Sequence, residues 1–386
     1  MTWETTLIHP TAKAPEGFRS LVPPVHRAST TVFDSTESLS DDWAIDRSGY
    51  TYGLYGTPTV QELAARIAEL EHGTYTFITP GGQAAISLID LAFVRAGDHI
   101  LVPDHIYGPN RALVSRVLHG LGVEATFYPP TIGAGVESLI KPNTVLVWCE
   151  SPGSVTMEVQ DVPAIAEVAH RHGAIVALDN TYAAGVFFDA FAHGVDVTMQ
   201  ALTKYVGGHS DLLLGSVTVR SEELYRKLGM TRQLLGMGVS PDECSLALRG
   251  LLTLGVRLKA LEASTLEVAR WLAARPEIET VLHPALPSCP GHEIWQRDFT
   301  GSTSVFSVVF DAKYSMDAIR AFVDSLELFE IGWSWGGVTS LAVPQFTIPR
   351  SHPQFRRESL VRFNIGLESP SDLIADLERG LGVLGA

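Results

Sequence analysis

The pattern of hydrophobic and polar positions changes twice along the chain. Up to about residue 56, apolar residues are scattered among Pro, Ser and Thr with no helical or strand period, which predicts irregular structure. A helix is then expected to begin at the capping box Thr59–Glu62, because apolar residues recur there every three or four positions. Gly73 is expected to end this helix.

Beyond this helix, short apolar runs alternate with helical stretches. The helical stretches include Ala84–Arg95 and Asp161–His172, with Asp161 as the N-cap. Continuous apolar strands separated by helices are typical of a parallel sheet that is buried on both faces, hence of an α/β domain. The expected strands are Tyr75–Ile78, His99–Val102, Thr144–Cys149, Ala174–Leu178, Val195–Met199 and Leu213–Val219.

After about residue 250 the order of elements changes and predicts a smaller α+β domain. We therefore expect an N-terminal segment (1–56), an α/β domain (57–250) and a C-terminal α+β domain (251–386). The elements expected in the last part are the helix Val256–Ala274, the strand Ser304–Phe310, the helix Met316–Ser325, the strand Leu360–Ile365 and the helix Ser371–Leu384.

Composition narrows the class of protein. The 386 residues carry a formal charge of −15, which argues against nucleic acid or an anionic membrane surface as a partner. The three cysteines form no paired spacing, and the His and Cys residues show no metal-ligand spacing, so we expect neither disulfides nor a bound metal. No signal peptide or transmembrane run is recognisable, and the expected location is therefore the cytoplasm.

Three motifs in the α/β domain contain groups that are used in ligand binding or catalysis. The turn Thr79–Gln83 follows a strand and opens a helix, so its backbone N–H groups form an anion site to which Gly82 permits close approach. Asp179 ends a buried strand, where open α/β sheets bind ligands, and Lys204 follows the next strand beside a Gly-Gly pair. Taken alone, the turn, the acid and the lysine suit an ordinary turn, a helix cap and a solvated loop equally well or better.

The order of these motifs along the chain, together with further segments after them, is similar to that in a known family. The chain is similar from end to end to the Cys/Met-metabolism family of enzymes that use pyridoxal 5′-phosphate (PLP), which have the fold-type I architecture. The segments that carry this resemblance are Glu150–Val159, Asp179–Thr181, Thr203–Tyr205, Gly208-His209, Trp333–Gly337 and Arg362–Glu368.

The resemblance implies roles for the cofactor-binding residues. Lys204 would hold PLP as a Schiff base and act as the general base, and Asp179 would keep the pyridine nitrogen protonated. Tyr107 would stack on the ring, although core packing explains such a tyrosine as well. The phosphate would be held by Gly82, Gln83 and Thr203.

The resemblance also implies how a substrate is bound. Arg362 would fork onto the α-carboxylate, a structural ion pair being the alternative, and Ser334 would help to position that carboxylate or the lysine. Tyr52 matches a tyrosine that reaches the cofactor and substrate of a neighbouring subunit. Two departures follow it: Leu54 stands in place of a phosphate-binding arginine, and Tyr55 stands where a basic residue contacts the far end of the substrate.

Within the family, the motifs are most similar to those of enzymes that cleave L-cystathionine at its β-carbon. The expected reaction is a carbon–sulfur β-elimination that yields homocysteine, pyruvate and ammonia. A γ-lyase, a γ-replacement enzyme or a lyase for another cysteine conjugate would use the same scaffold. A PLP-fold protein that binds without catalysis is the alternative of another class. The shared site implies a homo-oligomer, with a dimer of dimers as the expected assembly.

Overall fold

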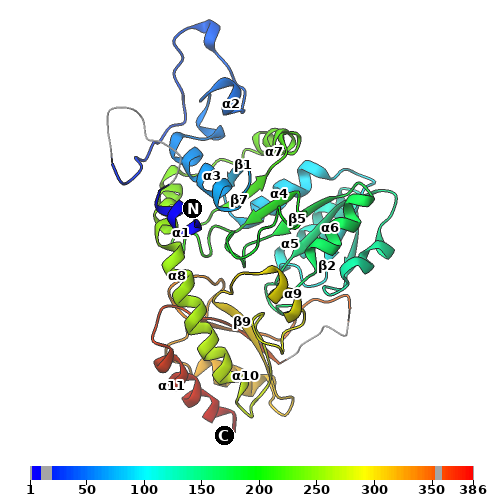
Figure 1. The fold of residues 1–386 in the computed structure, drawn as a ribbon, viewed down its shortest axis with the longest axis vertical. Coiled ribbons are helices and arrows are strands. Elements are labelled where there is room, and N and C mark those ends of the chain that lie inside the picture. The colour runs from blue at the N-terminus through cyan, green and yellow to red at the C-terminus, as the bar shows by residue number, and fades with distance from the viewer. Residues whose placement is uncertain (1, 10–19, 353–358, 386) are drawn as a thin grey trace.

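A computed structural model describes residues 2–9, 20–352 and 359–385. Its main feature is a seven-stranded sheet in the order β1-β7-β6-β5-β4-β2-β3, in which β7 alone runs against the other strands (Figure 1). The mostly parallel sheet expected from the alternating pattern is confirmed. Its strands are β1 (Tyr75–Thr79), β2 (His99–Pro103), β3 (Glu124–Tyr128), β4 (Thr144–Glu150), β5 (Ile175–Asp179), β6 (Val197–Gln200) and β7 (Gly215–Val219).

Successive strand residues enter two separate cores, one on each face of the sheet. Leu101 of β2 belongs to a core shared with α3 (Pro58–Leu70), α6 (Val162–Arg171) and α8 (Pro241–Ala273). Ile100 and Val102 belong to the opposite core, which includes side chains of α4 (Gly82–Phe93). This explains why the strands are continuously apolar, since both faces are covered by helices.

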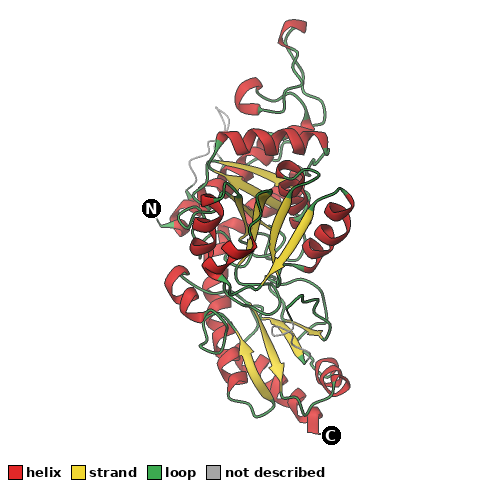
Figure 2. Ribbon diagram, turned by 90° about the vertical axis from the view of Figure 1, so that its right-hand side faces the viewer, coloured by secondary structure: helices red, strands yellow, loops and turns green. Residues whose placement is uncertain are grey.

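A second sheet follows in the chain and forms the lower part of the molecule (Figure 2). It has the order β10-β11-β9-β8, and all of its neighbouring strands are antiparallel. A third core joins this sheet to its helices. The elements are β8 (Ile278–Leu282), α9 (His292–Asp298), β9 (Val305–Phe310), α10 (Met316–Asp324), β10 (Leu341–Gln345), β11 (Leu360–Asn364) and α11 (Pro370–Leu381).

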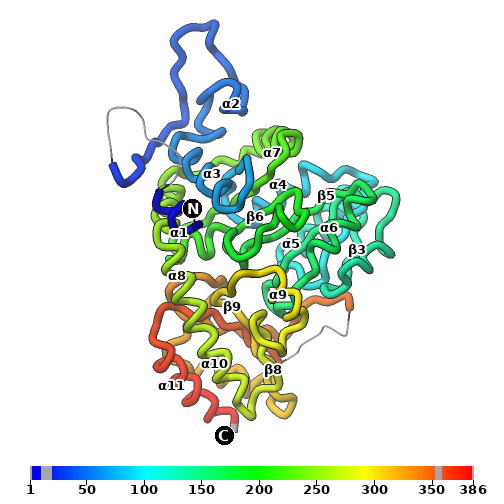
Figure 3. The backbone as a smooth tube through the Cα atoms, viewed as in Figure 1, coloured from blue at the N-terminus to red at the C-terminus, as the bar shows by residue number. Residues whose placement is uncertain are grey.

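The helix α8 joins the two sheets and runs along both (Figure 3). It begins at Pro241, well before the expected start at Val256, and residue 250 lies inside it. Ser240 caps it by accepting a hydrogen bond from the Asp242 backbone N–H. The helix covers the large sheet at its beginning and the small sheet at its end, so its sequence shows no single apolar stripe that would reveal its length.

The start of α3 differs from the capping box that the sequence predicts. Thr57 is the N-cap and Pro58 occupies the first turn, where proline is favoured. The hydroxyl of Thr59 instead donates to the Pro24 carbonyl and accepts from the His26 N–H. The side chain of Thr59, which the local pattern assigned to the helix cap, therefore bonds instead to residues that are distant in sequence. The N-cap predicted at Asp161 is confirmed, because its carboxylate accepts from Ala164 N–H.

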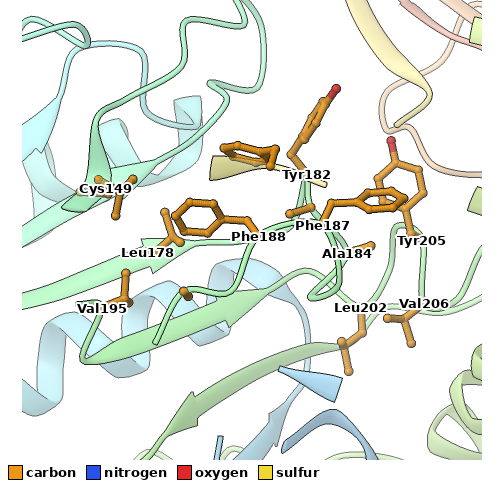
Figure 4. Close-up of a cluster of buried hydrophobic side chains, with 14 of the residues drawn as sticks. Cys149, Leu178, Tyr182, Ala184, Phe187, Phe188, Val195, Leu202, Tyr205 and Val206 are labelled. Atoms are coloured by element: carbon orange, nitrogen blue, oxygen red, sulfur yellow. The ribbon is translucent and has the colours of Figure 1, made fainter. Parts of the chain in front are cut away.

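Several elements were not predicted at all: β3, β8, β10, α9 and the helix α7 (Glu222–Leu234). The connection between β5 and β6, predicted as neither helix nor strand, contributes aromatic side chains to the core on one face of the sheet. Figure 4 shows Phe188 beside Leu178, with Phe187 and Tyr182 further along the same connection.

Two parts of the N-terminal segment are described: α1 (Trp3–Ile8) packs against α3 and α8, whereas residues 20–56 project from the body beyond α3 (Figures 1 and 2). Residues 10–19 of this segment lie outside the described residues. Leu21, Val32 and Leu39 are exposed, whereas Trp43 is buried against Phe77 and Tyr225. The segment is therefore anchored at several points, here by Trp43 and elsewhere by the ion pairs of Arg27 with Asp242 and of Asp46 with Arg226, but it still leaves some apolar side chains uncovered within the chain.

Candidate active site

The carboxyl ends of the central strands surround a cavity of about 290 Å³. β1 leads into the glycine turn before α4, β4 and β5 end at Glu150 and Asp179, and the loop after β6 carries Lys204. The predicted residues Gly82, Gln83, Tyr107, Asp179, Thr203 and Lys204 all line this cavity. Other lining residues are Glu150, Pro152, Ser154, Thr181, Tyr182, Met199, Ala201 and Trp335.

Lys204 has the properties of a reactive amine. Its Nζ donates to the Ser334 hydroxyl at 2.5 Å and lies 5.4 Å from the centre of the Trp335 ring. Burial and the positive charge of Arg362 lower the pKa of Lys204 to about 8, although the charge of Asp179 opposes them. An amine with such a pKa is partly neutral at physiological pH and can attack an aldehyde.

Two buried carboxyl groups stand side by side across the sheet. Asp179 and Glu150 are register partners on β5 and β4. Burial raises the pKa of both, and the charge of Asp179 contributes to raising the pKa of Glu150 to about 8. Glu150 accepts the backbone N–H of Tyr107 and of Ser154, each at 2.7 Å. It thus fixes two loops that line the cavity, while Asp179 lines the cavity together with Lys204.

The start of α4 presents uncapped backbone N–H groups to the same cavity. Its N-cap is Gly81, with φ at 128°, and no side chain caps the helix. A Cβ at Gly82 would lie 2.8 Å from that of Ala201, so only glycine fits there. The buried Oε1 of Gln83 has no hydrogen-bond partner among the described residues. The Thr203 hydroxyl, by contrast, is already engaged with the Leu214 carbonyl at 3.1 Å.

These features fit PLP. The helix start supplies N–H donors for a phosphate, the acid is placed for a pyridinium nitrogen, and the amine is placed for an aldehyde. Bound PLP would make its ring an electron sink for a carbanion at the substrate α-carbon. The described residues contain no group of His, Cys, Asp and Glu that could hold a metal.

A second cavity of about 410 Å³ shares Tyr107, Ser154, Lys204 and Trp335 with the first and also contains Ser334 and Arg362. Arg362 is buried on β11, and its hydrogen bonds to described residues are long, to the carbonyls of Ser154 at 3.3 Å and Ser334 at 3.5 Å. Tyr107, at the start of α5 (Gly108–Ala112), has a pKa raised by burial and by Asp179 and Glu150. Its hydroxyl therefore stays protonated.

Tyr52 and Tyr55 are not brought to either cavity by their own chain. Tyr52 is 47% exposed, and its ring lies 6.2 Å from that of Tyr55. The Tyr55 hydroxyl accepts a hydrogen bond from Gln233 at 3.0 Å. Leu54 faces Gly238, and Arg47, the nearby basic residue, pairs with Asp42.

Sequence reasoning assigned no role to Glu150, Ser154, Trp335 or Arg350, all of which line one of the two cavities. Glu150 offered a usable signal, because it ends a buried strand just as Asp179 does. Arg350 offered none, since it lies in an irregular stretch and is brought to the site by the fold alone.

Comparison with known proteins settles the class. The chain matches the model of the Cys/Met metabolism PLP-dependent enzymes over residues 4–382, and it belongs to this family. The fold-type I architecture and PLP as the cofactor are thereby confirmed.

Two curated relatives and one solved structure illustrate the similarity. The chain is 42% identical to cystathionine beta-lyase MetC of Escherichia coli, over 92% of each chain. It is 38% identical to cystathionine beta-lyase of Haemophilus influenzae, over 94% of this chain and 93% of the other. A cystathionine gamma-lyase from Lactobacillus plantarum, solved with L-serine, aligns with a TM-score of 0.91 at 29% identity over the whole of both chains.

Proposed function

We propose that this protein is a PLP-dependent carbon–sulfur β-lyase that cleaves L-cystathionine, or a related cysteine thioether, to a thiol, pyruvate and ammonia. With L-cystathionine the thiol is homocysteine. The observation that carries the proposal is the shared wall of the two cavities. Lys204, with a pKa of about 8, faces Asp179 and the start of α4 on one side and Arg362 on the other.

In this proposal, three groups hold the cofactor. Lys204 binds its aldehyde carbon, Asp179 pairs with the ring nitrogen, and the N–H groups of Gly82 and Gln83 bind the phosphate, which Thr203 borders. Tyr107, at the opening of the cavity, stacks on the ring. Glu150 holds the Tyr107 backbone in that place through its 2.7 Å contact.

Residues of the same two cavities account for the proton transfers of the proposed reaction. Arg362 and Ser334 bind the substrate α-carboxylate beside Lys204, which is within 2.5 Å of the Ser334 hydroxyl. Beside the bound substrate, the amine of Lys204 would be the base that takes the proton from the α-carbon. The leaving thiolate then receives a proton from Tyr107, whose raised pKa keeps its hydroxyl protonated, or from Lys204.

The exposed Tyr52 supports a shared site. We propose that Tyr52 and Tyr55 of one protomer contact the cofactor and substrate of the neighbouring one, which requires at least a two-fold dimer. A dimer of dimers in the cytoplasm is the proposed full state. No helix among the described residues combines the length and apolar character of a membrane span.

Product analysis tests the reaction type. Purified protein supplied with PLP and L-cystathionine should release pyruvate and homocysteine, with little 2-oxobutyrate. Lys204→Ala, which lacks the base, serves as the control and should release neither keto acid. Dominant 2-oxobutyrate would mean cleavage on the γ side and would overturn the β-lyase assignment while leaving the family intact.

A further inference from the structure

The second cavity carries a surplus of positive charge. Its lining contains the basic residues Lys204, Arg111, Arg350 and Arg362, whereas Asp104 is the one acidic residue in the described lining. A volume of about 410 Å³ accommodates an amino acid with a long side chain. One substrate α-carboxylate at Arg362 would leave this charge only partly compensated.

Arg111 is not available to a ligand. Its guanidinium pairs with Asp104, donates to the Asp104 carbonyl at 3.0 Å and lies 3.9 Å over the ring of Phe127. Asp104 in turn accepts backbone N–H groups of Ser351 and His352 at 2.7 and 2.9 Å. The charge of Arg111 is therefore already compensated within the chain, and Asp104 fastens the segment that carries Arg350.

Arg350 is buried but only half satisfied. Its side chain is 1% exposed, and its Nη2 donates to the Thr156 hydroxyl and to Glu158 at 3.3 Å. Its Nε and Nη1 have no hydrogen-bond partner among the described residues. Buried guanidinium N–H groups without acceptors are uncommon in folded proteins, and in a cavity wall they favour an acceptor that arrives with a ligand.

Glu158 holds Arg350 in place as a permanent anion. Burial alone would raise its pKa, but the contact with His105 at 3.4 Å and the charge of Arg350 lower the pKa of Glu158 to about 2. The guanidinium is therefore fixed on one edge by Glu158 and Thr156. Its remaining donors are left for a second partner, which is the arrangement of a preorganised carboxylate site.

We infer that Arg350 binds the distal carboxylate of a dicarboxylic thioether whose α-carboxylate is bound by Arg362. This inference rests on the proposed function and names its substrate class. The Tyr55 position lacks the basic residue that would otherwise serve this end of the substrate. The distal ammonium of cystathionine meets no free carboxylate in the described lining, because Asp104 is already paired. The site thus selects the carboxylate and not the amine.

Two synthetic substrates separate these features in the holoenzyme. S-(3-Carboxypropyl)-L-cysteine keeps the distal carboxylate of cystathionine without its amine, and S-butyl-L-cysteine replaces the carboxylate by a methyl group. For the wild type we expect a kcat/KM for the carboxypropyl substrate at least about tenfold above that for the butyl substrate. It should also come within a few-fold of the value for L-cystathionine.

Arg350→Lys keeps a positive charge beside Glu158 while removing the two unpartnered donors. We expect it to lower the carboxypropyl-to-butyl ratio of kcat/KM about tenfold, chiefly through KM for the carboxypropyl substrate. Arg111→Lys is the matched control, because that arginine lines the same cavity but is paired with Asp104, and a lysine there can keep this pair and so the position of the Arg350 segment. It should leave the ratio unchanged.

The outcomes distinguish this inference from the proposed function. Equal kcat/KM for the two substrates in the wild type, or an equal loss for both in Arg350→Lys, would overturn the distal-carboxylate site while leaving the β-lyase intact. Failure of the wild type to release pyruvate from any of the three substrates would overturn the proposed function itself, and this inference with it.

Discussion

The acidity of Lys204 leads to a quantitative prediction for the cofactor-free protein. Only the neutral amine attacks an aldehyde, and a lysine at its ordinary pKa of 10.5 is neutral in about 0.03% of molecules at pH 7. With a pKa of about 8, Lys204 is neutral in about 10%. The reactive fraction at pH 7 is therefore about 300 times that of an exposed lysine.

The assay is the rate at which cofactor-free enzyme binds PLP covalently, followed by absorbance between pH 6 and pH 10. Dividing this rate by the rate for Nα-acetyl-lysine at the same pH cancels the pH dependence that comes from the ionisations of PLP itself. The enzyme's own rate should rise about tenfold per pH unit and level off near pH 8, so the ratio should fall steadily above that pH.

Two variants test the cause of the shift. Arg362 is the second cause after burial, so Arg362→Gln should move the plateau to higher pH. Asp179 opposes the shift, so Asp179→Asn should move it to lower pH. A rate for the wild type that climbs without a plateau to pH 10 would refute the reasoning, because Lys204 would then titrate as an ordinary exposed lysine.

Three further predictions concern other residues. Glu150→Gln leaves one of two backbone N–H groups without an acceptor, and kcat/KM for the substrate should fall about tenfold; unchanged kinetics would contradict its positioning role. Burial raises the pKa of Asp90 from 3.8 to about 7. The stability that its protonated carboxyl group contributes is therefore complete below pH 3.8 and is lost as pH rises through 7. Asp90→Asn, which still accepts from Trp148, should therefore be about 4 kcal/mol more stable than the wild type at pH 8 and nearly equal to it at pH 4 in urea unfolding. Inactive Lys204→Ala and Tyr52→Ala variants, mixed and allowed to exchange subunits, should regain activity, and mixtures that stay inactive after verified exchange would place Tyr52 in its own chain's site or in none.

Much of the fold followed from the apolar pattern because the large sheet is covered on both faces. The runs around Ile100 and Val147 are continuous and end at turn residues, which makes them legible as buried strands. β3 was missed because it lies at the sheet's edge and is only partly buried, so its pattern is weak. The start of α3 was misplaced because Thr59 forms its hydrogen bonds with residues 24 and 26, which local pattern does not reveal.

The candidate site was predictable where chemistry and strand ends coincide. Asp179 and Lys204 each follow an apolar strand, and parallel strands bring such ends to one edge. Arg350 could not be predicted in this way. It lies between β10 and β11, in irregular chain, and is held at the cavity by its own contact with Glu158 and by that of Ser351 with Asp104, both remote in sequence.

The central claim is that Lys204 holds the cofactor, and one measurement tests it directly. Purified enzyme loaded with PLP is reduced with borohydride, which fixes the lysine–cofactor bond, and is then digested and analysed by tandem mass spectrometry. The account predicts one stoichiometric pyridoxyl group per chain, on Lys204. A pyridoxyl group on another lysine, or none on a protein that retains its activity, would contradict it.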